Sequence, residues 1–158
     1  MTKPYQKWRD DCIVFLDDCF ASDSAVATLA PYFELRDFRI IFPDERKGKQ
    51  NGVLDTPVIK KCHEEKWLLL TTDHEMGNTH VEEIKKHPNV TILATAHNST
   101  TPEEYRQWLA AVIKLKPKIL RMYKKEQRPW VATFSREANI TSFRSITAEH
   151  TTRRTKKK

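Results

Sequence analysis

The stretch IVFLDD, residues 13–18, gives the clearest indication of the fold of the chain. It joins a run of apolar residues, two of them β-branched, directly to Asp17 and Asp18. A short apolar run bounded by polar residues is typical of a β-strand that is buried on both faces. A strand that ends in two carboxylates places negative charge at the rim of a hydrophobic core, which is costly unless a partner such as a cation compensates it.

The same pattern recurs in the stretch WLLLTTD, residues 67–73. Here too an apolar run ends in an acid, Asp73, and Glu75 follows two residues later. The functional interpretation depends on this pair of stretches, because each predicts a buried strand with acidic residues at its carboxyl end.

Length and composition predict a single globular domain. The chain has 158 residues, of which 39% are hydrophobic and 31% charged, and this suits one sizeable core. No apolar run is long enough for a transmembrane helix, and the first residues lack the apolar stretch of a signal peptide. We therefore expect a cytoplasmic protein that does not enter a membrane. The three cysteines, Cys12, Cys19 and Cys62, lack zinc-site spacing and fit small buried or half-buried thiols.

Charge divides the chain into an acidic front and a basic back. Residues 1–113 hold 14 Lys and Arg against 18 Asp and Glu, whereas residues 114–128 hold 7 against 1 and residues 129–158 hold 7 against 2. This distribution suits a protein that meets phosphates and keeps a carboxylate cluster elsewhere. A solubilising tail together with a solvated helix face would give the same pattern.

The expected domain organisation follows these patterns. We expect residues 1–149 to form one domain, with a core over about 13–115, a kinked basic helix over about 102–127 and a terminal β-hairpin over about 130–146. Residues 150–158 are predicted to be a disordered basic tail.

Capping residues predict where the helices begin. Ser22 or Asp23 is expected to cap a first helix, and Thr56 followed by Pro57 marks the start of a second.

Two further helices carry the capping-box pattern. Thr79 with Glu82 predicts a short helix, and Thr101 followed by Pro102 begins a longer amphipathic one. Pro117 is expected to kink or split the longer helix.

Four further segments are predicted to be strands: residues 38–42, 90–94, 130–134 and 140–144, the last two forming the terminal hairpin. Strands that alternate with helices predict an α/β fold, a three-layer α/β/α sandwich with a mostly parallel sheet.

This topology is expected to bring the acids to one edge of the sheet. Parallel strands share an edge at their carboxyl ends, and a crossover helix begins at that same edge. Asp17 and Asp18 end the first strand, Asp73 and Glu75 follow the strand from residue 67, and Asp55 precedes the second helix. We therefore expect these side chains to converge.

Converging carboxylates predict a divalent cation. Each carboxylate raises the pKa of its neighbours, and Mg²⁺ or Mn²⁺, which take oxygen ligands, would relieve the repulsion. The implied chemistry is hydrolysis of a phosphodiester bond by a metal-activated water. Each acid also has a simpler interpretation: Asp55 could cap its helix, Asp18 could face solvent, and Asp73 and Glu75 could be ordinary turn and loop acids.

Basic residues in two regions are candidates for contacts with an RNA backbone. One group lies in the charged loop 44–52 and the other in the basic helix and just after it. The predicted nucleic-acid-binding residues are Arg46, Lys47, Lys49, Lys118, Arg121, Lys124, Lys125 and Arg128.

Three stretches taken together, residues 13–18, 54–59 and 68–76, resemble the PIN-like nuclease family, which includes the VapC-type toxin ribonucleases. The shared pattern is a strand that ends in Asp, an Asp that opens a helix, and a strand that ends in Thr-x-Asp with an acid two residues later. Cys19, where relatives commonly carry a polar residue, and the long basic loop 44–52 depart from that pattern.

The resemblance implies a ribonuclease that depends on Mg²⁺ or Mn²⁺ and hydrolyses RNA. The toxin of a toxin–antitoxin pair, with an antitoxin protein as partner, is one role that it suggests. It implies that Asp17, Asp55 and Asp73 are metal ligands and catalytic residues, with Glu75 as the fourth acid. Asp18 matches a position that is often acidic in this branch of the family.

Two other classes of protein remain as alternatives. A response-regulator receiver also begins with a strand ending in paired acids, but it needs a phosphoacceptor Asp at the end of a middle strand and a later strand-end Lys. A non-catalytic PIN-like module could bind nucleic acid or a protein without cutting. A homodimer is a further possibility, because Met122 and Tyr123 fit either a dimer seam or the core.

Overall fold

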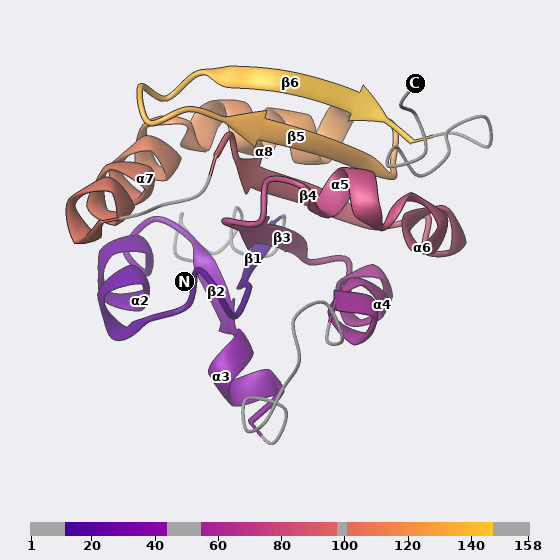
Figure 1. Ribbon diagram of the computed structural model, residues 1–158, viewed down its shortest axis with the longest axis horizontal. Coiled ribbons are helices and arrows are strands. Elements are labelled where there is room, and N and C mark those ends of the chain that lie inside the picture. The colour runs from indigo at the N-terminus through magenta and orange to yellow at the C-terminus, as the bar shows by residue number, and fades with distance from the viewer. Residues whose placement is uncertain (1–11, 44–54, 98–100, 147–158) are drawn as a thin grey trace, which may run out of the picture.

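A computed structural model describes residues 12–43, 55–97 and 101–146 and gives the chain an α/β fold built on one six-stranded sheet (Figure 1). The strand order is β2-β1-β3-β4-β5-β6. The strands are β1 (Ile13–Leu16), β2 (Glu34–Asp37), β3 (Leu68–Thr71), β4 (Thr91–Thr95), β5 (Trp130–Phe134) and β6 (Ile140–Ser145). The helices are α2 (Asp23–Leu29), α3 (Phe38–Ile41), α4 (Asp55–Glu65), α5 (Met76–Thr79), α6 (Val81–Lys86), α7 (Pro102–Lys114) and α8 (Lys116–Lys125).

The sheet is mostly parallel. β1 pairs in parallel with β2 and with β3, and the parallel order continues through β4 to β5. Among the strands of the described ranges, only β6 runs antiparallel, as the second strand of a hairpin with β5. The predictions of an α/β fold, a mostly parallel sheet and a terminal hairpin are confirmed.

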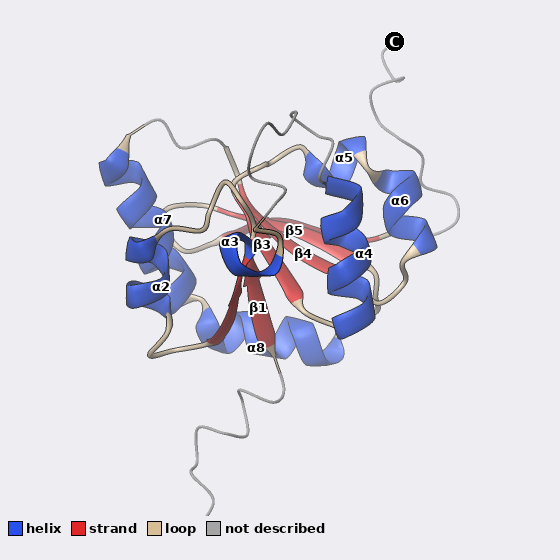
Figure 2. Ribbon diagram, turned by 90° about the horizontal axis from the view of Figure 1, so that it is seen from below, coloured by secondary structure: helices blue, strands red, loops and turns tan. Residues whose placement is uncertain are grey.

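Helices cover both faces of the sheet, and alternate residues of each strand contact different helices. Val14 and Leu16 of β1 belong to a core cluster that includes side chains of α2, α7 and α8. Phe15, between them, belongs to a second cluster with side chains of α3, α4, α5 and α6. Figure 2 shows α2 and α7 on one side of the strands and α4, α5 and α6 on the other. The arrangement is compatible with the three-layer sandwich expected from the sequence.

Two predicted helix caps are formed as the sequence indicates. The Ser22 hydroxyl accepts a hydrogen bond from the Ala25 N–H at 2.9 Å and caps α2. The Thr101 hydroxyl accepts one from the Glu104 N–H at 3.1 Å and caps α7, with Pro102 as the first helical residue. Each cap satisfies a backbone N–H that the helix itself leaves without a partner.

The strand predicted for residues 38–42 is wrong: residues 34–37 form β2, and the apolar residues after them form the short helix α3. Asp37 ends the strand, because its carboxylate accepts a hydrogen bond from the Arg39 N–H at 2.9 Å and so caps α3. Phe38 then turns into the core against Phe15, with ring centroids 6.4 Å apart. A local cap therefore overrides the strand propensity of the apolar run.

The capping box predicted for Thr79 is also wrong. Thr79 is the last residue of α5, and its hydroxyl donates to the Glu75 carbonyl at 3.2 Å. The next helix, α6, begins at Val81 after His80, without a side-chain cap.

The long C-terminal helix is divided at Leu115, as Pro117 predicts. α7 ends at Lys114 and α8 begins at Lys116, so Pro117 occupies the first turn of a new helix, where a missing N–H costs little. Met122 and Tyr123 are buried in the core cluster that α2, α7 and α8 form on one face of the sheet. The dimer-seam interpretation of these two residues is therefore wrong.

Within the described ranges, no helix has both the length and the apolar composition needed to cross a bilayer. Loop 44–52 and the predicted tail 150–158 lie outside the described residues.

Candidate functional site

The carboxyl ends of β1 and β3 form the point where the chain reverses its direction of progress across the sheet. From β1 the chain continues to β2 on one side, and from β3 it continues to β4 on the other. In open α/β sheets, ligands bind outside the carboxyl ends of strands at such a switch point. Two acids of the sequence pattern, Asp17 and Asp73, follow these two strands.

Asp17 is fixed at this edge by its backbone and by its carboxylate. Its N–H donates to the Leu70 carbonyl of β3 at 3.0 Å, so the residue continues the β1–β3 ladder by one step. Only 5% of Asp17 is exposed. One carboxylate oxygen, Oδ1, accepts a hydrogen bond from the Asp18 N–H at 2.9 Å, and the other, Oδ2, accepts one from the Thr71 hydroxyl at 2.8 Å.

Thr71 joins the two strand ends through one buried hydroxyl. While the hydroxyl donates to Asp17, its oxygen accepts a hydrogen bond from the Asp73 N–H at 3.0 Å. The Asp73 carboxylate in turn accepts a hydrogen bond from the Glu75 N–H at 3.1 Å. The segment after β3 is therefore folded into a turn whose start is tied to the Asp17 carboxylate.

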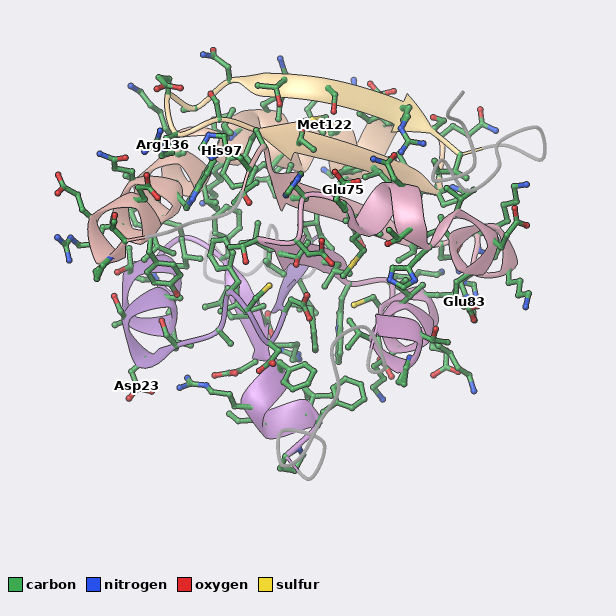
Figure 3. The ribbon with its side chains drawn as sticks, viewed as in Figure 1. Asp23, Glu75, Glu83, His97, Met122 and Arg136 are labelled. Atoms are coloured by element: carbon green, nitrogen blue, oxygen red, sulfur yellow. The ribbon has the colours of Figure 1, made fainter. Side chains whose placement is uncertain are left out.

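Glu75 extends this network toward the surface, beside the start of α5 (Figure 3). Its side chain is 54% exposed. The carboxylate oxygen Oε1 accepts a hydrogen bond from Asn78 Nδ2 at 3.0 Å, and Oε2 lies 3.3 Å from His74 Nε2. The acid that the sequence pattern places fourth thus has both carboxylate oxygens in contact with neighbouring side chains although it is exposed.

Cys19 belongs to the same network, which sequence reasoning did not foresee. The residue is exposed overall, but its sulfur lies 3.2 Å from the Thr71 hydroxyl and 3.7 Å from Asp17 Oδ2. Desolvation, followed by the negative charge of Asp17, raises the pKa of the Cys19 thiol to about 11. The sulfur is therefore a protonated thiol at neutral pH. The only sequence signal for its location is its position two residues after Asp17.

Asp55 is the first residue of α4, and its side chain lies outside the described part of the structure. α4 ends at Glu65 and leads at once into β3, with the Trp67 N–H donating to the Cys62 carbonyl at 3.0 Å. Because a crossover helix runs antiparallel to its strands, the start of α4 lies toward the carboxyl edge of the sheet. The backbone of Asp55 is thus on the side of the sheet that carries Asp17 and Asp73.

The described acids share an edge and a hydrogen-bond network without forming a compact cluster. Asp17, Thr71, Asp73 and Glu75 are connected by hydrogen bonds, and Asp18 contributes a backbone N–H. Among the side chains that the structure describes, no group of three or more His, Cys, Asp or Glu could hold a metal ion. A ligand set of three acids would therefore have to include Asp55, or the turn that carries Asp73 and Glu75 would have to rearrange.

Those predicted RNA-binding residues that the structure describes are not brought to this edge. Lys118, Arg121, Lys124 and Lys125 are exposed on α8. The Tyr123 hydroxyl of α8 donates to the carbonyl of Lys66, which lies just before β3 and therefore at the amino edge.

Arg128 lies at that amino edge as well, shortly before β5. It stacks over the Tyr123 ring at 4.2 Å and donates to the Tyr123 carbonyl at 2.8 Å. The other three predicted residues, Arg46, Lys47 and Lys49, lie outside the described residues.

Comparisons of the chain with protein-family models, with curated proteins and with solved structures gave no match. The fold and the site therefore define the class only as an α/β protein with acidic residues at a switch point, and the PIN-like resemblance stays a prediction.

Proposed function

We propose that the protein is a metal-dependent ribonuclease of the PIN-like type, with its active site at the carboxyl edge of β1 and β3. One observation supports this most directly: the buried Asp17 carboxylate is joined through the Thr71 hydroxyl to the Asp73 backbone at the switch point. A buried carboxylate needs compensation by hydrogen bonds or by a cation. Hydrogen bonds from the Asp18 N–H and the Thr71 hydroxyl contribute to this compensation, and in the proposal a cation adds to it.

The residues at this edge fit a hard divalent cation in chemistry. They offer carboxylate oxygens, which Mg²⁺ and Mn²⁺ prefer. In the proposal Asp17, Asp55 and Asp73 hold the metal, and Asp18 and Glu75 complete the set. When bound, the cation supplies an activated water and stabilises the leaving oxygen of a phosphodiester. The protein fixes Asp17 through Thr71 and fixes the turn that carries Asp73, so that neither acid has to be ordered when the substrate binds.

RNA binding is assigned in the proposal to the cations of α8, to Arg128 and to the cations of loop 44–52. These residues would contact phosphates and position the substrate without reading its sequence. A role as a toxin with an antitoxin partner also belongs to the proposal and has the family resemblance as its only support. A homodimer stays a prediction, and Met122 and Tyr123, on which it was based, are buried in the core.

The first test is cleavage of a labelled RNA pool by the full-length protein with Mg²⁺ or Mn²⁺ and with EDTA. Asp17→Asn and Asp73→Asn should each lose metal-dependent cleavage while the protein stays folded, because an amide is a poor ligand for a hard cation. Asp23→Asn is a matched control. Its carboxylate pairs with Arg39 on the exterior of α2, far from Glu75 in Figure 3, and cleavage should be unchanged.

Full activity in either Asp17→Asn or Asp73→Asn would contradict the site assignment. Metal binding without cleavage by the wild-type protein would favour the non-catalytic binding module.

A receiver-like phosphoacceptor domain is the second candidate, and the strand order favours it more than the sequence pattern did. Asp17 and Asp18 follow β1, and Asp73 follows β3, a middle strand of the sheet. A strand-end lysine is not found after β4 or β5 within residues 96–97 and 135–136; Arg136 stands after β5, paired with Glu104 at 3.2 Å. Incubation with a small phosphodonor such as acetyl phosphate distinguishes the receiver from the ribonuclease. A receiver would gain one phosphoryl group, and the Asp73→Asn variant would gain none.

A further inference from the structure

Glu75 is joined to the terminal hairpin by a continuous chain of hydrogen bonds. Arg144 of β6 donates to the Asn78 side-chain oxygen at 2.6 Å and to the Gly77 carbonyl at 3.1 Å. The Asn78 amide nitrogen then donates to Glu75 Oε1 at 3.0 Å. Arg144, near the end of the described chain, is thus connected through Asn78 to Glu75.

Arg144 determines which way the Asn78 amide faces. A guanidinium group has only donors, so the amide must turn its oxygen toward Arg144. The amide nitrogen is then left facing Glu75, where it can only donate. The direction of the Asn78–Glu75 hydrogen bond therefore depends on Arg144, which acts on Glu75 through Asn78.

The position of Arg144 relative to α5 is itself fixed by close packing. Arg144 pairs in register with Val131 of β5. Val131 packs so tightly under Gly77 that a Cβ at Gly77 would lie 2.5 Å from Val131 Cγ1. The hairpin and α5 therefore meet at a contact that leaves little freedom for the chain from Arg144 to Glu75.

We propose that Asn78 and Arg144 are positioning residues that orient Glu75 toward the metal site, which makes the β5–β6 hairpin part of that site. This inference rests on the proposed function, because it takes Glu75 to be a ligand in the metal's surroundings. A long, half-exposed carboxylate loses rotamer freedom when it binds a cation, and a clamp that orders it beforehand reduces this loss. Removal of a residue that hydrogen-bonds to a metal ligand typically lowers the metal affinity by about 10- to 100-fold.

Mn²⁺ binding by the full-length protein tests the inference without relying on cleavage. Asn78→Ala and Arg144→Met should each weaken Mn²⁺ binding by about tenfold. The direction is informative for Arg144: removing a positive charge near a cation would strengthen binding if only electrostatics mattered. Arg136→Met is the matched control, because Arg136 follows the same hairpin's β5, contacts Glu104 and Gln107, and lies apart from Glu75 in Figure 3. Its Mn²⁺ affinity should stay within twofold of the wild type, a change of at most about 0.4 kcal/mol.

A double-mutant cycle with Glu75→Gln decides whether Arg144 acts through Glu75. In the Glu75→Gln background, Arg144→Met should cause no further loss, because the group that it orients is already gone. Asn78→Ala should behave in the same way, which keeps the test valid if one variant folds poorly. Additive losses, or tighter binding in Arg144→Met, would overturn the inference and leave the proposed function standing.

Cleavage measured in parallel separates this inference from the proposed function. Coupled Mn²⁺ effects without RNA cleavage would support the positioning role and overturn the nuclease. A wild-type protein that binds no Mn²⁺ would overturn both.

Discussion

Thr71 is the residue on which the geometry of the acidic edge depends most. Its single hydroxyl donates to the buried Asp17 carboxylate and accepts from the Asp73 N–H, and the residue is wholly buried. The sequence shows Thr71 only as a polar residue at the end of an apolar run, where it could equally fill space. Its role depends on the β1–β3 register, which pairs Leu16 with Leu70 and so places Asp17 next to Thr71.

Replacing the hydroxyl should therefore cost stability. Thr71→Val keeps the shape but removes a hydrogen bond to a charged group, and we expect the free energy of unfolding to fall by about 2 kcal/mol. Thr71→Ser keeps the hydroxyl and loses one methyl group, which should cost only about 1 kcal/mol. Urea denaturation measures both values. Equal losses in the two variants would mean that packing, and not the hydroxyl, holds the strand ends together.

His63 gives the fold a dependence on pH that is separate from the acidic edge. Desolvation, and then the neighbouring His87, lowers the pKa of His63 below its ordinary value of 6.5, while Glu64 opposes the shift. Below pH 6.5 the unfolded chain then binds the proton more readily than the native state does, so the free energy of unfolding should fall as the pH drops from 6.5 through the lowered pKa.

His63→Asn should remove this dependence. His63 Nδ1 accepts a hydrogen bond from the Asn89 N–H at 3.1 Å, and an asparagine oxygen can accept the same bond without titrating. Urea denaturation between pH 5 and 7.5 compares the two proteins. A difference between them that does not vary with pH would contradict the assignment to His63.

At the scale of elements, the sequence predicts best the segments whose local and global preferences agree. β1 and β3 are recognised because continuous apolar runs fit strands buried on both faces. α2 and α7 are recognised because a cap and helical spacing coincide. Residues 38–41 mislead because the cap that turns them into a helix is the Asp37 side chain, and such a cap is no stronger in the sequence than the strand propensity of FRIIF. The Arg144–Asn78 contact joins residues 66 positions apart and has no periodic signal.

The contact between α5 and β5 should not tolerate a side chain at Gly77. In Gly77→Ala the new Cβ would meet stiff, β-branched Val131, so α5 or β5 must shift. We expect a loss of about 1–3 kcal/mol in the free energy of unfolding. Val131→Ala removes the clashing methyl groups, so the double variant should lose less than the sum of the two single changes. Additive losses in thermal or urea denaturation would show that the contact is looser than the structure indicates.

At the scale of the whole molecule, the acids that follow β1 and β3 and the cations of α8 lie at opposite edges of the sheet. Asp17 and Asp73 follow strands at the carboxyl edge, and the contact of Tyr123 with Lys66 brings α8 to the amino edge. Composition predicts the segregation along the chain, since the basic residues gather after residue 113. It does not predict the separation in space, which depends on where α8 crosses the fold (Figure 2).

If α8 binds RNA, its contribution should be separable from cleavage. Changing Lys118, Arg121 and Lys125 to Gln should weaken the binding of single-stranded RNA and reduce the slope of log affinity against log salt by about 2, at roughly 0.7 per lost phosphate contact. Single-turnover cleavage at saturating RNA should be unchanged. The same change at Lys60, Lys61 and Lys85 on α4 and α6 is the matched control. Unchanged affinity and slope in the α8 variant would leave its cations as an ordinary solvated surface.

The distance between the two edges would then act as a ruler. β1 and β3, which the acids follow, have four residues each, which corresponds to about 13 Å at roughly 3.3 Å per residue in a parallel strand. An oligonucleotide shorter than this span can touch the cations of α8 or the acids beyond β1 and β3, but not both. The protein would then hold short fragments weakly and release them after cutting, while longer strands stay bound, so that substrate length would select what is cut before any base is read.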